Sequence, residues 1–234
     1  MVTLVHYQLT GPVAVVTMDD GKANVMSVAM QEQLHQALDR AEADGAVVVL
    51  GGREGTFSAG FDLRVLAGSG REKLDMVIGG FRLAERLFSF PLPVIMACTG
   101  HAIAMGVFLL LCGDYRVGAA GTYRLGANEV ALGMNAPRAG IEIMRYRLAP
   151  ACFDRAVVLA EEFRGDKAVA CGWLDELAEP ADVFDVAVHK ASAIAALDRE
   201  AHRVSKLRTR SIAVAALRQA IADDEKDLAA RLGL

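Results

Sequence analysis

Two glycine-containing loops are the first candidates for chemistry in this chain. They are residues 56–63, TFSAGFDL, and residues 99–106, TGHAIAMG, and each lies between a predicted strand and a predicted helix. Where a loop enters a helix, the first backbone N–H groups lack partners and the helix dipole favours negative charge. If the two loops meet, they form a preorganised pair of donors for a developing oxyanion. The spacing alone also fits ordinary strand-to-helix turns.

The elements that must position these loops can be read from hydrophobic periodicity and turn residues. Residues 2–9 and 13–18 are predicted to form a hairpin joined at Gly11-Pro12, and Ser27 is a candidate N-cap for the next helix. The other predicted strands cover residues 46–50, 94–98 and 115–117, and the other predicted helices cover about 71–88 and 104–112. Residues 51–60 are expected to be a loop, and the chain beyond residue 141 is almost wholly helical in pattern. Strands with helical crossovers, followed by helices, predict an α/β core with a helical tail.

Composition limits the classes of protein to which this chain can belong. With 53% hydrophobic residues the chain can bury a large core, and its net charge of −4 argues against nucleic acid as a partner. We see neither a secretory pattern at the N-terminus nor an apolar run long enough to span a membrane. The cysteines are scattered, without metal-ligand spacing, and predict free thiols in a reducing cytoplasm. They are Cys98, Cys112, Cys152 and Cys171.

Four strings, in order, resemble the motifs of the enoyl-CoA hydratase/isomerase family, the crotonases. They are KANVMS around Asn24, FSAGFDL at 57–63, PVIMACTGHAIAMGVFLLLCGD at 93–114, and LGANEVALGMNAP at 125–137. The resemblance covers roughly residues 1–190. It implies a crotonase-like (ClpP/crotonase) α/β spiral of ββα units over residues 1–190. It also implies a C-terminal helical oligomerisation region at 191–234 and a homotrimer or hexamer.

The resemblance further implies an acyl-coenzyme A thioester as ligand, with no separate cofactor and no metal. The thioester oxygen would accept hydrogen bonds from the N–H groups of Phe61 and Met105, with Gly106 beside the latter. The sequence departs from the family here, because AMG replaces the usual run of glycines. The other residues that the resemblance places near the substrate or its CoA are Lys22, Ala23, Asn24, Ser58, Ala59, Gly60, Asp62, Leu63, Phe108, Pro137 and Arg138. Asp62 is also a candidate helix cap.

The acid/base position decides the reaction. Family hydratases use two glutamates, and the second aligns with Glu129, whereas the first is replaced by Phe108. Phenylalanine can neither orient water nor transfer a proton, whereas one buried glutamate can shuttle a proton between two carbons. An enoyl-CoA isomerase with Glu129 as base and acid is therefore our leading hypothesis. A hydratase stays open if Asn135 or Arg138 replaces the lost carboxylate, and so does a non-catalytic acyl-CoA binding protein.

Three other features carry expectations. The basic segment 202–210, HRVSKLRTR, is typical of a solvated helix face, or could contact CoA phosphates. Asp114 is expected to fix the next strand by hydrogen bonds. His101 lies in the second loop and is a weaker catalytic candidate.

Overall fold

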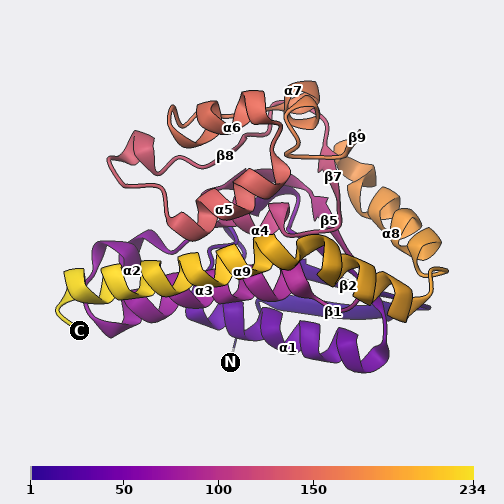
Figure 1. Ribbon diagram of the computed structural model, residues 1–234. Coiled ribbons are helices and arrows are strands. Elements are labelled where there is room, and N and C mark those ends of the chain that lie inside the picture. The colour runs from indigo at the N-terminus through magenta and orange to yellow at the C-terminus, as the bar shows by residue number, and fades with distance from the viewer. Residues whose placement is uncertain (1) are drawn as a thin grey trace.

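The computed structural model describes residues 2–234, which fold around two β-sheets (Figure 1). The larger sheet has the order β1-β2-β3-β5-β7-β9, and the smaller sheet has the order β4-β6-β8. The strands are β1 Val5–Thr10, β2 Val13–Met18, β3 Val47–Gly51, β4 Gly55–Ser58, β5 Val94–Cys98, β6 Gly100–Ile103, β7 Tyr115–Ala119, β8 Leu125–Gly126 and β9 Glu176–Ala178. The pairs β3–β4, β5–β6 and β7–β8 each place one strand in each sheet and are followed by helices. This repeated ββα order confirms the predicted α/β spiral.

The helices cover the sheets from several sides (Figure 1). They are α1 Val28–Asp44, α2 Leu63–Ala67, α3 Arg71–Ser89, α4 Met105–Leu111, α5 Arg138–Arg147, α6 Pro150–Val157, α7 Gly165–Ala170, α8 Val183–Ile194 and α9 Arg199–Leu232, with 3₁₀ turns η1 Val130–Leu132 and η2 Pro180–Asp182. The Ser27 side chain accepts a hydrogen bond from the Met30 N–H, as its predicted capping role requires. The hairpin of β1 and β2 pairs Thr10 with Val13 across the predicted turn.

The core lies on both faces of the larger sheet because successive side chains along each strand point to opposite faces. Val49, Ile95 and Val117 pack with α8, whereas Val48 and Leu50 join the larger cluster on the opposite face. That larger cluster includes apolar residues of α1, α3, α4, α5 and α9. α9 runs alongside α3 and contacts α5 (Figure 1). The candidate residues on α4, which are Met105, Gly106 and Phe108, are thus surrounded by packed helices.

Three short strands depart from the predicted elements. Residues 51–60, expected to be a loop, contain β4, and the second glycine loop contains β6. Beyond residue 141, β9 interrupts the expected helices and pairs with β7. The predicted division at residue 190 falls inside α8, which packs on the larger sheet. The division into two regions stays a prediction.

The prediction of four free thiols is wrong for two cysteines. Cys152 on α6 and Cys171 at the end of α7 form a disulfide, with their Cα atoms 5.7 Å apart. The turn between α7 and Trp173 returns the chain to α6, where the Ala149 N–H donates to the Cys171 carbonyl. Cys98 and Cys112 are free and buried. The cytoplasmic prediction, which rested on all four thiols, stays a prediction.

The expected solvated face at residues 202–210 is also wrong for its two central cations. Lys206 and Arg210 are buried, and both bind the Asp114 carboxylate, at 2.8 Å and 2.6 Å. They therefore cannot serve as free contacts for CoA phosphates. Asp114 does fix a strand, but it is β5 and not the next one, because its carboxylate accepts the Val94 N–H at 2.8 Å. The ion cluster holds the first half of α9 against the core.

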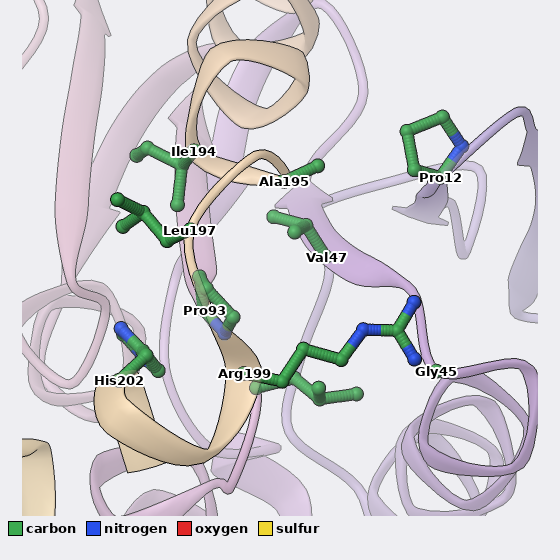
Figure 2. Close-up of a pocket in the computed structure, with 10 residues that line it drawn as sticks. Pro12, Gly45, Val47, Pro93, Ile194, Ala195, Leu197, Arg199 and His202 are labelled. Atoms are coloured by element: carbon green, nitrogen blue, oxygen red, sulfur yellow. The ribbon is translucent and has the colours of Figure 1, made fainter.

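A narrow pocket lies at the link between α8 and α9 (Figure 2). Val47, Ile194 and Leu197 contribute apolar walls, and Arg199 and His202 contribute its polar groups. None of its lining residues belongs to the two glycine loops. Across residues 2–234, no helix is both long and apolar enough to cross a membrane.

Candidate active site

The two glycine loops meet, as the oxyanion interpretation requires. β4 and β6 are parallel neighbours, so the chain leaves both strands at the same edge of the smaller sheet. Gly60 has a φ of +94°, and a Cβ added there would lie 3.0 Å from the Ala104 Cβ and 3.3 Å from the Met105 nitrogen. Glycine is therefore needed at position 60 both for its backbone conformation and for the close approach of the second loop.

Three backbone donors around this meeting point are free. Across residues 2–234, no protein atom accepts a hydrogen bond from the N–H of Phe61, Met105 or Gly106. A side chain on Met105 does not impede its own backbone donor. Unpaired donors on adjacent loops are the arrangement that an oxyanion hole needs.

Ala104 holds the second loop in a strained turn. Its φ of +51° is uncommon for a residue with a side chain. The conformation is fixed from both sides, because the Ala104 N–H donates to Gly126 and its carbonyl accepts from Val107. Gly106 is constrained differently, since a Cβ there would clash with the Ser58 carbonyl oxygen. The loop can thus tolerate Ala-Met in place of two glycines, whereas Gly106 is required by packing against β4.

Glu129 provides a buried carboxyl group. It precedes η1, its residue is 8% exposed, and its Oε2 atom has no hydrogen-bond partner within residues 2–234. Burial raises the pKa of this carboxyl above its ordinary value, and a hydrogen bond from its own backbone opposes the rise. A carboxylate that has lost water and gained few donors is a stronger base than one in solvent.

Phe108 belongs to a row of aromatic rings beside the second loop. The Phe61 and Phe81 rings meet edge to face at 6.3 Å, and the Phe81 and Phe108 rings lie 5.8 Å apart. Phe108 is 1% exposed, and its ring lies against Gly140 of α5, where a Cβ would come within 2.7 Å of the ring. Phe108 therefore fills the space between α3 and α5 completely.

Asn24 and Ser58 tie the first loop to the segment after β2. The Asn24 side-chain amide donates to the carbonyls of Met18 and Phe57, and its oxygen accepts the Asp20 N–H. The Ser58 hydroxyl donates to the Asn24 carbonyl and accepts the Gly60 N–H. Both residues are fully buried, so they hold the first loop in place and present no surface to a ligand.

The remaining predicted ligand residues of these two segments lie toward solvent. Lys22, Ala59 and Leu63 are exposed, and Ala23 is partly buried with its carbonyl accepting the Ala59 N–H. Arg53, which sequence reasoning missed, donates to the Lys22 carbonyl at 3.0 Å and adds a second cation beside Lys22. In the sequence, only the position of Arg53 in the loop before FSAG pointed to it.

Asp62 is the N-cap of α2, which confirms its predicted structural role. Its side chain accepts the Arg64 N–H at 2.9 Å, and the Arg64 side chain and backbone hold the pKa of Asp62 below its usual value. An open groove of about 520 Å³ begins at Asp62 and runs between α2 and the N-terminal ends of α1 and α3. It offers room for a ligand much larger than a thioester group.

Pro137 and Arg138 mark the beginning of α5. Pro137 precedes its first turn, and the Arg138 side chain is bound by Asp224 at 3.2 Å and Asp227 at 2.7 Å, both on α9. The arginine considered as a replacement for the lost glutamate is therefore paired with α9. Asn135 is exposed.

One further sequence candidate is His101, in the second glycine loop. The Nδ1 atom of His101 accepts the Arg124 N–H, and its ring packs edge to face on Tyr123. His101 therefore has a structural contact, which links β6 to the segment before β8.

Phe81 and Gly140, which enclose Phe108, were missed because no motif links residues of α3, α4 and α5. Among the described residues, no group of three or more His, Cys, Asp or Glu side chains is placed to hold a metal ion.

Known proteins match nearly the whole chain. The profile of the enoyl-CoA hydratase/isomerase family matches residues 9–229. A carnitinyl-CoA dehydratase from Salmonella enteritidis PT4 is 29% identical over 186 residues, which is 78% of this chain and 70% of the relative.

Solved structures agree with this match. An enoyl-CoA isomerase from Mycobacterium tuberculosis is 46% identical, with a TM-score of 0.91 over 94% of this chain and 97% of that one. An enoyl-CoA hydratase from Mycobacterium marinum is 44% identical, with a TM-score of 0.93 over 97% and 100% of the two chains. Human mitochondrial Δ3-Δ2-enoyl-CoA isomerase, at 24% identity and a TM-score of 0.91 over 98% and 92%, shares the fold. With its ββα spiral and its two loops of free backbone donors, the chain belongs to the enoyl-CoA hydratase/isomerase family, the crotonases, and is an acyl-CoA enzyme of the hydratase/isomerase type.

Proposed function

We propose that this enzyme is an enoyl-CoA isomerase that moves a double bond from position 3 to position 2 of an acyl-CoA, with Glu129 as its only proton carrier. The single observation that carries the proposal is the buried, unpartnered carboxyl of Glu129, in a chain that has a buried phenylalanine, Phe108, where the family motif has its other glutamate. Isomerisation needs one group that removes and returns the same proton. Hydration needs a second polar group to hold water.

The steps balance without any other reactant. The thioester oxygen of a 3-enoyl-CoA accepts the N–H groups of Phe61 and Met105. The Glu129 carboxylate removes a proton from C2, and the electron pair of that bond delocalises over C2, C3 and C4 and the thioester carbonyl as a dienolate. The protonated Glu129 then delivers the proton to C4, which leaves a double bond between C2 and C3.

Each group suits its step. The backbone donors stabilise the charge that develops on the thioester oxygen, and such donors contribute about 3–4 kcal/mol each in enzymes that use them. The raised pKa of Glu129 narrows the difference between its own pKa and the much higher pKa of the C–H group at C2. The buried ring of Phe108 occupies the position where the family motif has a second carboxylate, and it cannot hold water there by hydrogen bonds.

Hydration is the second candidate, because a 44% identical solved structure is described as an enoyl-CoA hydratase. It would require a polar group other than Phe108 to orient the attacking water. Arg138 is engaged by two carboxylates, which counts against it. An acyl-CoA binding protein without activity remains the third reading, favoured by Phe108 and Met105.

The ligand and assembly follow from the same proposal. The groove beside Asp62 and the cations at Lys22 and Arg53 are suited to a CoA ester with its phosphates, and no separate cofactor is needed. Self-association as a homotrimer or hexamer rests on the family resemblance alone. We also retain residues 191–234 as an oligomerisation region and the cytoplasm as the compartment.

The deciding experiment follows 3-hexenoyl-CoA and crotonyl-CoA separately by absorbance and mass. We expect isomerisation of the first and no water addition to the second. In Glu129→Gln, kcat should fall by about a hundred- to ten-thousandfold because proton transfer is lost. Binding of unreactive butyryl-CoA, measured by calorimetry, should be retained.

The matched control is Glu32→Gln, which changes an exposed glutamate of α1. Its activity should equal that of the wild type. Undiminished turnover in Glu129→Gln would reject the mechanism, hydration of crotonyl-CoA would select the second candidate, and tight binding without any product would select the third.

A further inference from the structure

Glu129 stands at the start of an exposed arch, residues 130–137. The side chains of Val130, Leu132 and Met134 are 43%, 58% and 43% exposed, so packing does little to fix this segment. The arch folds back on Glu129 itself, whose carbonyl accepts the N–H groups of Leu132 and Met134. Its position in the molecule is therefore set by its two ends, β8 before it and α5 after it.

The downstream end of the arch is held by the C-terminal helix. Pro137 precedes α5 and has no side chain that can accept a hydrogen bond. The N–H groups of Arg138 and Ala139 donate instead to the two carboxylate oxygens of Asp224 on α9, at 3.2 Å and 3.0 Å. Asp224 thus caps α5 from another element, 86 residues away in sequence. A carboxylate at this position also complements the positive end of the helix dipole.

Burial makes this cap specific. The Asp224 side chain is only 14% exposed, and its Oδ1 atom also accepts the Arg138 guanidinium at 3.2 Å. Asp227, at 44% exposure, binds the same guanidinium but no backbone N–H of α5. The neighbouring Glu225 points to α3, where it binds Arg82 at 2.7 Å. The three acidic residues of α9 therefore have different contacts. Asp224 caps α5, Asp227 binds only the Arg138 side chain, and Glu225 binds α3.

We propose that Asp224 is a positioning residue for Glu129. By capping α5 it fixes the downstream end of the arch and so holds the Glu129 carboxyl in register with the two backbone donors. This inference rests on the proposed function of Glu129. It makes the C-terminal helix part of the catalytic geometry of its own subunit.

The test compares Asp224→Ala with Asp224→Asn in the full-length protein. Asp224→Ala should lower kcat for 3-hexenoyl-CoA by about tenfold or more, because a small displacement of a proton carrier is costly. KM should change much less, since the thioester clamp is untouched. Asp224→Asn keeps one acceptor oxygen and should restore most of kcat. Amide hydrogen exchange of residues 130–141 should be faster in Asp224→Ala than in the wild type.

Glu225→Ala and Asp227→Ala are the controls, and both should keep nearly the wild-type kcat and exchange. An equal loss in Glu225→Ala would overturn the proposal, because general loosening of α9 would then explain the effect. Unchanged kcat and exchange in Asp224→Ala would also overturn it and leave the isomerase function standing. If the wild type isomerises nothing, the proposed function fails, and faster exchange in Asp224→Ala alone would still support the cap.

Discussion

The Glu129 carboxyl has lost most of its water without gaining a partner for Oε2. Such a group resists ionisation, so its base form becomes available only above the ordinary pKa of a glutamate. Proton removal from C2 needs that base form. The same burial that strengthens the base therefore limits the pH range in which it works.

The resulting prediction concerns the pH dependence of kcat/KM. Activity should rise with pH as Glu129 ionises in the free enzyme, and should be lost as pH falls through a pKa above the ordinary value of about 4.5. Initial rates with 3-hexenoyl-CoA across pH 4–9 would give this acid limb. An acid limb whose midpoint lies at or below pH 4.5 would contradict the desolvated environment of Glu129, provided that the protein stays folded at that pH.

At the residue scale, sequence motifs predicted which residues to examine but not what surrounds them. ANEVALG pointed to Glu129, and the position after AMG pointed to Phe108. The burial of Glu129 and the contact of Phe108 with Gly140 depend on where α5 packs. No local sequence pattern encodes how α5 packs against the other elements.

At the scale of elements, α4 and α5 fit together because Gly140 leaves room for the Phe108 ring. Two effects oppose each other when a methyl group is added there. Alanine favours the helix by about 1 kcal/mol. Three ring atoms within 2.7–3.0 Å of the new Cβ introduce strain that typically costs about 1–3 kcal/mol.

We therefore expect Gly140→Ala to lower the free energy of unfolding by up to about 2 kcal/mol, measured by urea titration. The double variant with Phe108→Leu should recover part of the loss, since a shorter side chain relieves the clash. The coupling energy from the double-mutant cycle isolates this contact. A more stable Gly140→Ala protein, or zero coupling, would show that the ring can move aside without cost.

Long elements were predicted well and short ones were not. The helix beginning after Ser27 is long enough for its period to be visible, and the strand at 94–98 is an apolar run introduced by Pro93. β8 has two residues and β9 has three, too few for any periodicity. These short strands exist because β6 and β7 offer them hydrogen bonds, which is a tertiary effect.

At the scale of the whole molecule, α9 is attached through a cluster with more positive than negative charge. Lys206 and Arg210 share Asp114, and the Arg147 guanidinium, which binds the Leu111 and Gly113 carbonyls, lies near enough to affect them. Burial lowers the pKa of Lys206 to about 8, although Asp114 opposes the change. The ordinary pKa of about 10.5 applies to the unfolded chain.

This difference predicts a rise in stability at alkaline pH. Between pH 8 and 10.5 the unfolded chain binds the Lys206 proton more readily than the folded protein, so the Lys206 contribution to unfolding free energy increases with pH. The gain is at most about 3 kcal/mol for a shift of this size. In urea titrations at pH 7.5, 9 and 10, the unfolding free energy of the wild type minus that of Lys206→Met, where the group is absent, should increase with pH.

Because other titrating groups are common to both proteins, the difference between the two curves reports on Lys206 alone. Parallel curves would mean that Lys206 keeps its proton on folding, and that Asp114 outweighs the burial. The depressed pKa of Asp114 acts at the other end of the scale, where stability falls as acid protonates it.

The global arrangement was only partly accessible from sequence. The family motifs gave the α/β spiral, because four strings in order are specific to it. The ion cluster joins positions 114 and 206, and the disulfide joins 152 and 171, so neither follows from local composition. A basic segment in an acidic protein suggested an exposed surface, whereas tertiary packing buried two of its charges.

The donors at Phe61 and Met105 are main-chain groups, and this has a consequence for how the enzyme can change over time. Replacing either side chain leaves the N–H in place, so amino-acid drift at these positions can reshape the pocket without deleting its electrostatic function. In the proposed mechanism the choice of reaction depends, in contrast, on individual side chains such as Glu129 and Phe108. A lineage built this way can exchange one chemistry for another in a few substitutions, while it inherits the activation of the thioester unchanged.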